Sequence, residues 1–410
     1  MNSNELFSIA LGLSHSWHIK NVSFLASTTG SSQDLIIDLD FLPGTTFLDQ
    51  FDEPCKAYDT EIKQWQHLNF FQHRCFINAR IPRIITSDGK TQVVTVPWAR
   101  KDSGFTLLFE VYAMLLIENE MPVNKAASTL KVVPHRLWRV FNYWINKAVS
   151  ADVLSSITHI GIDETSSKKG HKYVTVVADL TARRTIFVTQ GKDGNTLANF
   201  AQTLENKGGS VANINTISMD MSPAFIGGAV QNFPQAQLVF DKFHTVKLLN
   251  EAMDEVRKLE RQENEALRGH KYLFLRNYSK LKKKQVTELH LLIESYPKLG
   301  EAYKLKTLFI DMFNIESATD AKAYLTFWCE LAVESKLFPF MKFATTIKKH
   351  WAGMAAYFDK KVSNGLLESI NSKIQLAKKR ARGYRKTENF INMIYFLTAK
   401  LKFDYPHQTS

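Results

Sequence analysis

Cysteine is scarce in this chain of 410 residues, and long apolar runs are missing. The three cysteines, Cys55, Cys75 and Cys329, are too few and too scattered for a disulfide framework or a four-cysteine zinc site. The nearest approach to the ~18 apolar residues of a membrane span is 105–117, which contains Glu110. We therefore expect a protein of a reducing compartment that has no membrane partner.

A secretion signal is also missing from the sequence. The opening residues, MNSNELFSIALGL, carry an acid and no base ahead of their short apolar part, so we expect the chain to stay in the cytoplasm. Hydrophobic residues make up 45% of the sequence and charged residues 22%, a balance typical of folded domains. At roughly 150 residues per domain, this length predicts two or three domains.

Acidic residues are outnumbered by basic ones. Lysine and arginine number 52 against 40 aspartates and glutamates, which gives a net charge of +12. Most of the surplus lies in one segment, because residues 342–386 contain twelve cations and two acids. Charge that serves only solubility is the alternative, but its concentration in one segment favours a polyanionic partner such as nucleic acid.

The first hundred residues predict a small β-containing module. Strand-like pieces at 22–27 and 34–41 flank the polar turn TTGSSQ. Two further strands are predicted around the turn signal Ser87-Asp88-Gly89, and the residues from 51 onward are otherwise mixed and aromatic. We assign this module to residues 1–100.

Residues 101–152 predict a helix-turn-helix. Two short helices meet at a turn near Val132–Pro134, and apolar residues recur on one face of each. The predicted inner faces carry Ala126, Ala127 and Leu130 on the first helix and Leu137, Val140, Phe141 and Trp144 on the second. His135, Arg136 and Arg139 lie near the start of the second helix, where contacts to DNA would be made. A purely structural helical hairpin has the same pattern and remains an alternative.

From residue 157 the hydrophobic period changes to two. Three strands are predicted in THIGIDET, KYVTVVADL and RTIFVTQG, and they precede alternating helices and strands that end in AQLVFD. This order predicts a mixed sheet with helices on its faces. The pattern is then helical from 243 to about 362, and a last helical block follows. We assign an α/β core to 153–250 plus 360–402, and a helical insertion to 251–359.

Three acids stand out in this part of the chain. Asp163 and Asp220 each end a predicted apolar strand, where loops and ligands gather. Glu368 shares one face of a predicted helix with Asn371, Lys379 and Arg382. Three carboxylates could hold two Mg²⁺ or Mn²⁺ ions for phosphoryl displacement, while the rest of the helix face follows a phosphate backbone. Helix capping by the aspartates and a plain basic helix are the structural alternatives.

Long motifs in this chain resemble those of a known family. They are VPWARKDSGFTLLFE (96–110), GIDETSSKKGHKYVTVVADL (161–180), SMDMSPAF (218–225), VFDKFHTVKLLNEAMDEVR (239–257) and SNGLLESINSKIQLAKKRARGYR (363–385). In their order along the chain they resemble a DDE transposase of a bacterial insertion sequence, in the group written ISL-three.

The resemblance implies a ribonuclease-H-like catalytic core. Its triad would be Asp163, Asp220 and Glu368, and the long gap before Glu368 would be the helical insertion. His244, in the motif DKFH, would lie beside the metal site and position water or phosphate; a helix-start histidine bonded to a carbonyl is the alternative.

One departure from the family concerns the N-terminal module. Relatives carry a zinc-ribbon-like module with two cysteine pairs, of which this chain keeps only Cys55. His67, His73 and Cys75 do not have the spacing of a standard zinc site. We therefore expect a degenerate module that binds no zinc and is stabilised by its strands and its aromatic residues. The aromatic residues that we expect to stabilise it are Trp65, Phe70 and Phe71.

The activity that the resemblance implies is transposition. The protein would bind the terminal inverted repeats of its element, cleave a strand at each end with two Mg²⁺ or Mn²⁺ ions, and join the freed 3′-hydroxyl to target DNA. Its partner would be double-stranded DNA, bound by a homodimer at the bacterial nucleoid. We predict DNA contacts at His135, Arg136, Arg139, Asn371, Lys379, Arg380, Arg382 and Arg385. The alternatives are a non-catalytic DNA-binding regulator and a structure-specific nuclease.

Overall fold

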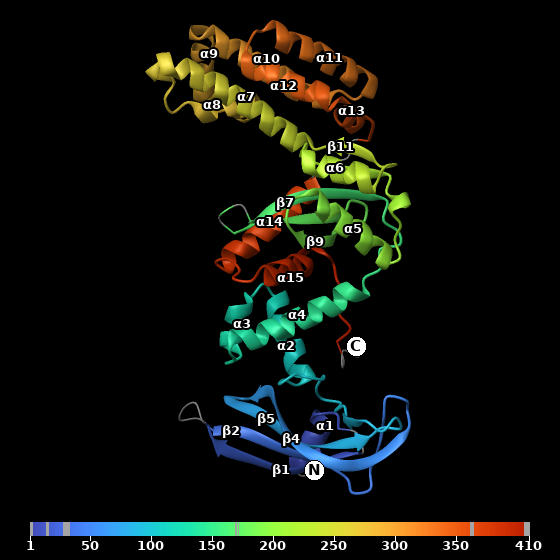
Figure 1. The fold of residues 1–410 in the computed structure, drawn as a ribbon. Helices are drawn as coiled ribbons and strands as arrows, with labels where there is room; N and C mark the ends of the chain where they lie inside the picture. Colours follow the sequence, from blue (N-terminus) through green and yellow to red (C-terminus); the bar gives the residue numbers. More distant parts are fainter. Residues whose placement is uncertain are drawn as a thin grey trace. The chain divides into compact units, whose positions relative to one another are not determined.

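The computed structural model describes residues 3–13, 16–27, 33–168, 170, 172–360 and 365–405 (Figure 1). The chain forms two compact units. The N-terminal unit comprises Met1–Ala148 with Lys402–Ser410, and the C-terminal unit comprises Val149–Leu401. Most of the predicted turn TTGSSQ lies outside the described residues.

A six-stranded sheet dominates the N-terminal unit after a short helix, α1 (Ser3–Ala10). The sheet runs β1-β2-β5-β4-β3, and β6 pairs with β5; the β2–β5 pair is parallel and every other pair is antiparallel. Its strands are β1 (Trp17–Ala26), β2 (Gln33–Phe41), β3 (Thr46–Leu48), β4 (Pro54–Phe70), β5 (His73–Ile85) and β6 (Thr91–Val93).

The long strand β4 is absent from the sequence-based prediction. Almost all of its first ten residues are polar or exposed, so the alternation that marks a half-buried strand does not develop there. Its pairing with β5 over most of its length supplies the order that local sequence does not. Tertiary pairing thus forms a strand in a stretch whose mixed polar and aromatic sequence predicted no regular element.

Aromatic side chains fill the core of this sheet. Trp98 packs edge-on against both Trp17 and Trp65, at ring-centre distances of 4.8 and 5.8 Å. The expected role of Trp65 is confirmed by its burial, but Phe70 and Phe71 are exposed at the turn between β4 and β5, so for these two the prediction is wrong. They lie outside the core because they are at the end of the β4–β5 hairpin, where Phe70 meets Phe71 edge-on and also contacts the Phe7 ring.

Three helices complete the N-terminal unit: α2 (Leu107–Glu118), α3 (Val123–Thr129) and α4 (Pro134–Ala151). The turn between α3 and α4 lies where the sequence predicts it. The predicted inner faces of both helices are confirmed, since all seven of their apolar residues are buried.

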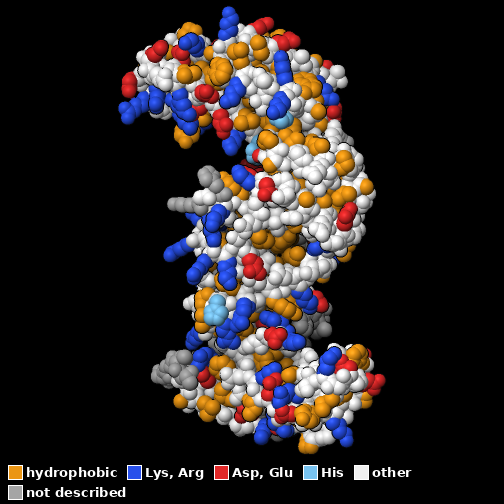
Figure 2. Space-filling model, viewed as in Figure 1, with side chains coloured by type: hydrophobic (Ala, Val, Ile, Leu, Met, Phe, Trp, Pro, Cys, Tyr) orange, Lys and Arg blue, Asp and Glu red, His pale blue; other side chains and the backbone are white. Residues whose placement is uncertain are grey.

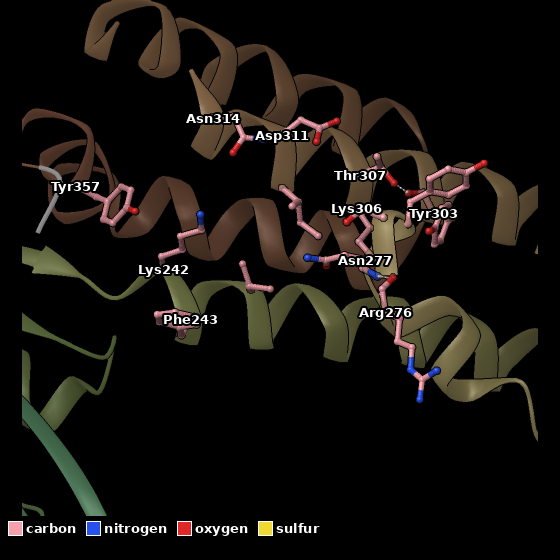
Figure 3. Close-up of a pocket in the computed structure, with 14 residues that line it drawn as sticks. Lys242, Phe243, Arg276, Asn277, Tyr303, Lys306, Thr307, Asp311, Asn314 and Tyr357 are labelled. Carbon is pink, nitrogen blue, oxygen red and sulfur yellow. Dashed lines mark hydrogen bonds between the residues drawn. The ribbon is translucent and has the colours of Figure 1, made fainter. Parts of the chain in front are cut away.

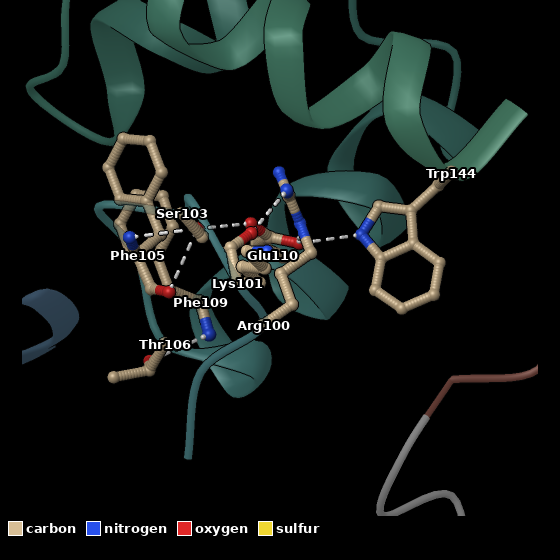
Figure 4. Close-up of polar contacts among 8 residues, drawn as sticks. All are labelled: Arg100, Lys101, Ser103, Phe105, Thr106, Phe109, Glu110 and Trp144. Carbon is tan, nitrogen blue, oxygen red and sulfur yellow. Dashed lines mark hydrogen bonds and ion pairs between the residues drawn. The ribbon is translucent and has the colours of Figure 1, made fainter. Parts of the chain in front are cut away.

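A buried carboxylate organises these helices. Glu110 of α2 has no exposed surface, and three donors converge on it (Figure 4). Arg100 Nε and Trp144 Nε1 lie 2.9 and 2.8 Å from Oε2, and Ser103 Oγ lies 2.6 Å from Oε1. A buried charge is tolerated only when it is paired and hydrogen-bonded, and this carboxylate is both. The network explains why the 96–110 motif ends in a glutamate.

The C-terminal unit is built on a five-stranded sheet of order β11-β10-β7-β8-β9. The first three strands along the chain form an antiparallel meander, and β10 and β11 are added parallel to β7. The mixed α/β sheet predicted from the sequence is thereby confirmed. Its strands are β7 (His159–Lys168), β8 (Lys172–Asp179), β9 (Arg184–Gln190), β10 (Thr216–Met219) and β11 (Gln237–Phe240).

Helices cover both faces of this sheet. Ile160 and Ile162 of β7 join one hydrophobic core with α5 (Gly194–Asn206) and α6 (Pro223–Asn232). On the other face lie α14 (Gly365–Arg380) and α15 (Thr387–Thr398), and the Tyr395 hydroxyl of α15 accepts a hydrogen bond from Val188 N of β9. Alternation along β7 therefore directs Gly161 and Asp163 toward α14.

The remaining helices form a layer that continues this core. They are α7 (Lys242–Glu263), α8 (Lys271–Leu275), α9 (Lys283–Ser295), α10 (Pro297–Asp311), α11 (Ala318–Glu334), α12 (Phe338–Lys349) and α13 (Trp351–Lys360), with short 3₁₀ turns at Val211–Asn213, Glu265–Leu267, Tyr278–Lys280 and Met312–Asn314. Their buried side chains belong to the same hydrophobic core as the sheet. The sequence-based assignment puts the boundary between the α/β core and the helical insertion at residues 250/251. That position falls inside α7, which runs unbroken from the sheet into the helical region.

Candidate active site

Three aspartates form a row across the C-terminal unit's sheet. Ser218 of β10 pairs with Gly161 of β7, so Asp220 is level with Asp163 two residues further on. Met219 pairs with Phe240 of β11, so Asp241 is level with Asp220. Because the three strands are parallel neighbours, these carboxylates collect at one edge of the sheet.

Asp163 lies in an environment that disfavours its charged form. Burial raises its pKa to about 6, and the charges of Asp241 and Asp220 raise it as well. A hydrogen bond from Glu164 N and the nearby His244 act in the opposite direction. Three carboxylates in a partly dry site beside one histidine have too little counter-charge, which is the environment that favours a bound cation.

Asp220 has the capping contact that the structural alternative predicts. Its Oδ1 accepts a hydrogen bond from Ser222 N at 3.0 Å, in the turn that leads into α6. The residue that caps α6 is nevertheless Ser222, so Asp220 lies before the helix rather than in the cap position. The contact orients the carboxylate and involves only one of its oxygens.

Asp241 and His244 form a pair at the start of α7. Asp241 caps the helix through Phe243 N and lies 2.7 Å from His244 Nδ1. A carboxylate can only accept, so the imidazole donates from Nδ1 and presents its other nitrogen outward. The hydrogen bond to Asp241 raises the pKa of His244, and the charges of Asp163 and Asp220 raise it further. Sequence reasoning did not place Asp241 in the site, although its position directly after an apolar strand, like that of Asp220, is the signal that finds it. The predicted strand end at Asp163 is wrong, because pairing with β8 carries β7 on to Lys168.

Helix α14 runs along β7 beside the aspartate row. A Cβ at Gly161 would lie 2.9 Å from Leu367 Cδ1, so the absence of a side chain there permits the close approach of the helix. Asn371 Nδ2 donates to Asp163 Oδ2 at 2.6 Å, and Gln375 Nε2 donates to Thr165 Oγ1 at 2.7 Å. Asn371, which we predicted as a DNA contact, thus contacts the first aspartate.

Glu368 lies one helical turn before Asn371, on the same face of α14. Its side chain is exposed. Within the described ranges, no group of three or more His, Cys, Asp or Glu side chains is placed to hold a metal ion. Asp163 contacts Asn371 and Glu164 N instead, and Asp241 contacts His244. The structure therefore brings Asp163 and Asp220 into one row and places the Glu368 helix beside it, without closing a three-carboxylate cage.

A basic surface continues from the end of α14. The exposed cations of this segment are Lys379, Arg380, Arg382, Arg385 and Lys386. Lys168, at the end of β7, donates to the Arg385 carbonyl at 2.6 Å and fixes the turn after the helix. Figure 2 shows Lys and Arg side chains gathered over this region, at the left edge of the middle part of the view.

The predicted DNA contacts on α4 divide into two kinds. His135 and Arg139 are exposed. Arg136 is half-buried: its guanidinium lies 4.2 Å from the centre of the Phe105 ring and donates to the Gly104 carbonyl. Arg136 therefore holds the segment before α2 against α4.

Comparison with known proteins bears directly on this arrangement. Residues 160–394, more than half of the chain, match the DDE transposase model of the ISL3 group, which is described as "Transposase". The chain belongs to the ISL3 family of DDE transposases. Residues 94–145 of the transposase match the "Helix-turn-helix domain of transposase family ISL3", so the predicted helix-turn-helix and family resemblance are both confirmed.

Curated relatives agree with the family. The transposase is 27% identical over 363 residues to the transposase for insertion sequence element IS1557 of Mycobacterium tuberculosis, a match that covers 80% of each chain. It is 24% identical over 345 residues to the transposase for insertion sequence element IS1001 of Bordetella parapertussis, covering 82% of this chain and 84% of that one.

These findings place the transposase in an enzyme class that catalyses DNA cleavage and strand transfer and that is generally dependent on divalent metal ions. Its helix-turn-helix is a DNA-binding domain. In the described part of the chain, each helix is too short or too polar to cross a membrane.

Proposed function

We propose that this transposase binds the terminal inverted repeats of its own insertion sequence, cleaves a strand at each end and joins the freed 3′-hydroxyl to target DNA. Asp163, Asp220 and Glu368 form the proposed triad. The observation that carries the proposal is the row of aspartates just past the parallel pairing of β7, β10 and β11, with α14 packed against Asp163.

The strand order supports a ribonuclease-H-like core. An antiparallel meander of three strands, extended on the first strand's side by two parallel strands, is the arrangement expected of that fold. It places Asp163 on the central strand and Asp220 on its parallel neighbour. The helices between β11 and α14 are then an insertion into the core, and they bring the chain back to the sheet at Glu368.

The donor set suits hard divalent cations. Aspartate and glutamate oxygens are the ligands that Mg²⁺ and Mn²⁺ prefer, and the pKa of Asp163, raised by burial and by the neighbouring carboxylates, supports a site that takes up positive charge. Asp163, Asp220 and Glu368 would hold two ions, and Asp163 would exchange its contact with Asn371 for one of them. When bound, such ions activate the attacking oxygen and stabilise the leaving one.

Asp241 and the residues beside the row would orient the proposed metal ligands and the DNA strand. Asp241 fixes the His244 ring, whose outward nitrogen is available to donate to a phosphate oxygen or a water. Asn371 holds Asp163 in place through its amide. The basic surface after α14 would follow the phosphate backbone, and His135 and Arg139 would contact DNA through α4.

The assembly that this reaction requires holds two element ends at once. A homodimer on DNA supplies one site for each end. Because the substrate is chromosomal DNA, we place the transposase at the bacterial nucleoid in the cytoplasm.

The proposal is tested with Asp163→Asn, Asp220→Asn and Glu368→Gln in the full-length protein. DNA carrying the ends of its element is incubated with Mg²⁺, and cleavage and strand transfer are followed on gels. Each variant should lose both activities by more than a thousandfold while still binding the ends. The matched control is Glu164→Gln, because Glu164 adjoins Asp163 but pairs with Lys192.

The possible outcomes separate three functions. Normal cleavage by all three variants would show that the triad is wrongly assigned. Binding without metal-dependent cleavage by the wild type would indicate a DNA-binding regulator, and cleavage without joining would indicate a nuclease.

A further inference from the structure

Side chains of α14 form a ladder of hydrogen bonds with β7. Its three rungs, at 2.6, 2.7 and 2.7 Å, run from Asn371 Nδ2 to Asp163 Oδ2, from Gln375 Nε2 to Thr165 Oγ1 and from Lys378 Nζ to the Ser166 carbonyl. The first rung reaches the aspartate row, and the other two continue along β7 beyond it. The ladder therefore ties the helix that carries Glu368 to the strand that carries Asp163.

The spacing of the rungs fits a single register. The helix rises about 10.5 Å from Asn371 to Lys378, at 1.5 Å per residue. The strand advances about 10 Å from Asp163 to Ser166, at about 3.3 Å per residue. Because the two lengths agree, all three bonds form at once. A slip of one residue would turn every donor by about 100° around the helix axis and break the ladder.

The apolar contacts of α14 specify this register less strictly. Its buried apolar residues are Leu366, Leu367, Ile370 and Ile374. Burial of apolar surface is non-directional, whereas a hydrogen bond weakens steeply when its angle is lost. The apolar stripe therefore holds the helix on the sheet, and the rungs hold it at one position along the strand.

Glu368 depends on that position. It lies two turns before Gln375 on the same side of α14, and its side chain is exposed. The place of its carboxylate relative to Asp163 is thus set by the place of the whole helix. A shift of α14 by one residue would move this carboxylate by about 1.5 Å along the axis and swing it away from the aspartate row.

A lysine that donates to backbone carbonyls also joins elements elsewhere in this unit. Lys306 of α10 lines a cavity in the helical layer and donates to the carbonyls of Phe274 and Arg276 at 2.6 and 3.1 Å (Figure 3). Its ammonium serves the fold by holding α10 to the end of α8. Lys378 makes the same kind of contact beside the aspartate row, where it holds α14 to β7.

We propose that Gln375 and Lys378 are positioning residues for the metal site, an inference that rests on the function proposed above. By holding α14 in register on β7, they place the Glu368 carboxylate within reach of the ions that Asp163 and Asp220 bind. Neither residue is itself a proposed ligand, and both act through Glu368.

The test measures Mn²⁺ binding by the full-length protein without DNA, followed by electron paramagnetic resonance. Gln375→Ala, Thr165→Val and Lys378→Met should each weaken Mn²⁺ binding by about tenfold, the effect expected of residues that orient metal ligands. Lys378→Arg should keep most of the affinity, because a guanidinium can still donate to the carbonyl. The control is Lys373→Met, which removes an exposed lysine of the same helix and should bind Mn²⁺ like the wild type.

A double variant tests whether the second rung acts as a unit. Gln375→Ala combined with Thr165→Val should bind Mn²⁺ no more weakly than either single variant, because both changes remove the same hydrogen bond. Losses that multiply to about a hundredfold would contradict the rung. Gln375→Ala should also bind duplex DNA in EDTA like the wild type. Weaker duplex binding with unchanged Mn²⁺ binding would identify Gln375 as a DNA contact and overturn the proposal.

Glu368→Gln in the same Mn²⁺ titration separates this proposal from the triad. If Glu368→Gln weakens Mn²⁺ binding and the rung variants do not, the positioning role is overturned and the triad stands. If only the rung variants weaken it, the assignment of Glu368 is wrong and the rungs do not act through it. If none of these variants changes Mn²⁺ binding, both proposals are overturned.

Discussion

At the scale of single residues, charge placement separates an acid that is satisfied within the fold from one that we propose as a metal ligand. Glu110 is fully buried but has three donors, so its charge is satisfied within the protein. Asp163 receives an amide and a backbone N–H but stands beside Asp220 and Asp241, and its pKa is raised to about 6. The first arrangement satisfies its charge within the fold, whereas the second holds unfavourable charge that the proposed metal ion would relieve.

The Asp163 site therefore gives a pH-dependent prediction. Between the ordinary pKa of 3.8 and the raised value of about 6, the folded protein binds more protons than the unfolded chain, so its stability falls as pH rises through this window. Asp163→Asn removes the effect. We expect the metal-free variant to be more stable than the wild type at pH 7 by up to about 3 kcal/mol, and to differ little at pH 4.

Denaturant unfolding at the two pH values measures this difference. Adding Mg²⁺ should then stabilise the wild type and leave Asp163→Asn unchanged, because only the wild type keeps the carboxylate charge. A variant that is less stable than the wild type at pH 7 would contradict this account of Asp163.

At the scale of elements, the contact between β7 and α14 decides whether the site can form. Gly161 lies on the same face of β7 as Asp163 and directly below Leu367 of α14. Alternating apolar residues predict the strand and a hydrophobic stripe predicts the helix, but neither pattern specifies that the two meet. The glycine at this position is what allows them to approach closely enough for Asn371 to reach Asp163.

Gly161→Ala tests this contact. The new Cβ would lie within 3 Å of both Leu180 and Leu367, so α14 or its side chains must shift. We expect a loss of about 1–3 kcal/mol in unfolding free energy and a larger loss in cleavage than in DNA binding. Gly227→Ala in α6 is the control, because nothing lies within 4 Å of its added Cβ, and it should be neutral or stabilising. Equal effects of the two changes would show that the β7–α14 contact is unimportant.

At the scale of the whole molecule, the net charge of +12 predicts how the transposase meets DNA. Neutralising phosphates releases counterions, so affinity for duplex DNA should fall about a thousandfold between 50 and 200 mM salt if some six phosphates are contacted. The double variant Lys379→Ala, Arg382→Ala should make the dependence of log K on log salt shallower by about 1.8.

Fluorescence anisotropy with a labelled duplex measures the slope. The comparison is Lys283→Ala, Lys284→Ala, an exposed basic pair on α9. If both pairs reduce the slope equally, DNA binding is not concentrated on the surface after α14.

The sequence by itself determined the local features of this transposase. Periodicity was sufficient for the helix-turn-helix faces and for the five strands of the C-terminal sheet, because burial on one side imprints a pattern on neighbouring residues. It was not sufficient for β4, whose partners rather than its own side chains hold it as a strand. The aspartates Asp163 and Asp220 could also be identified, since each follows an apolar run.

Only the tertiary structure decided which of these features act together. Register between strands brought Asp241 level with the two predicted aspartates. Packing at Gly161 brought Asn371 within hydrogen-bond distance of Asp163. The Arg136 guanidinium packs on the Phe105 ring. Such contacts join residues tens to hundreds of positions apart, and they depend on the shapes of whole elements, so no local pattern in the sequence records them.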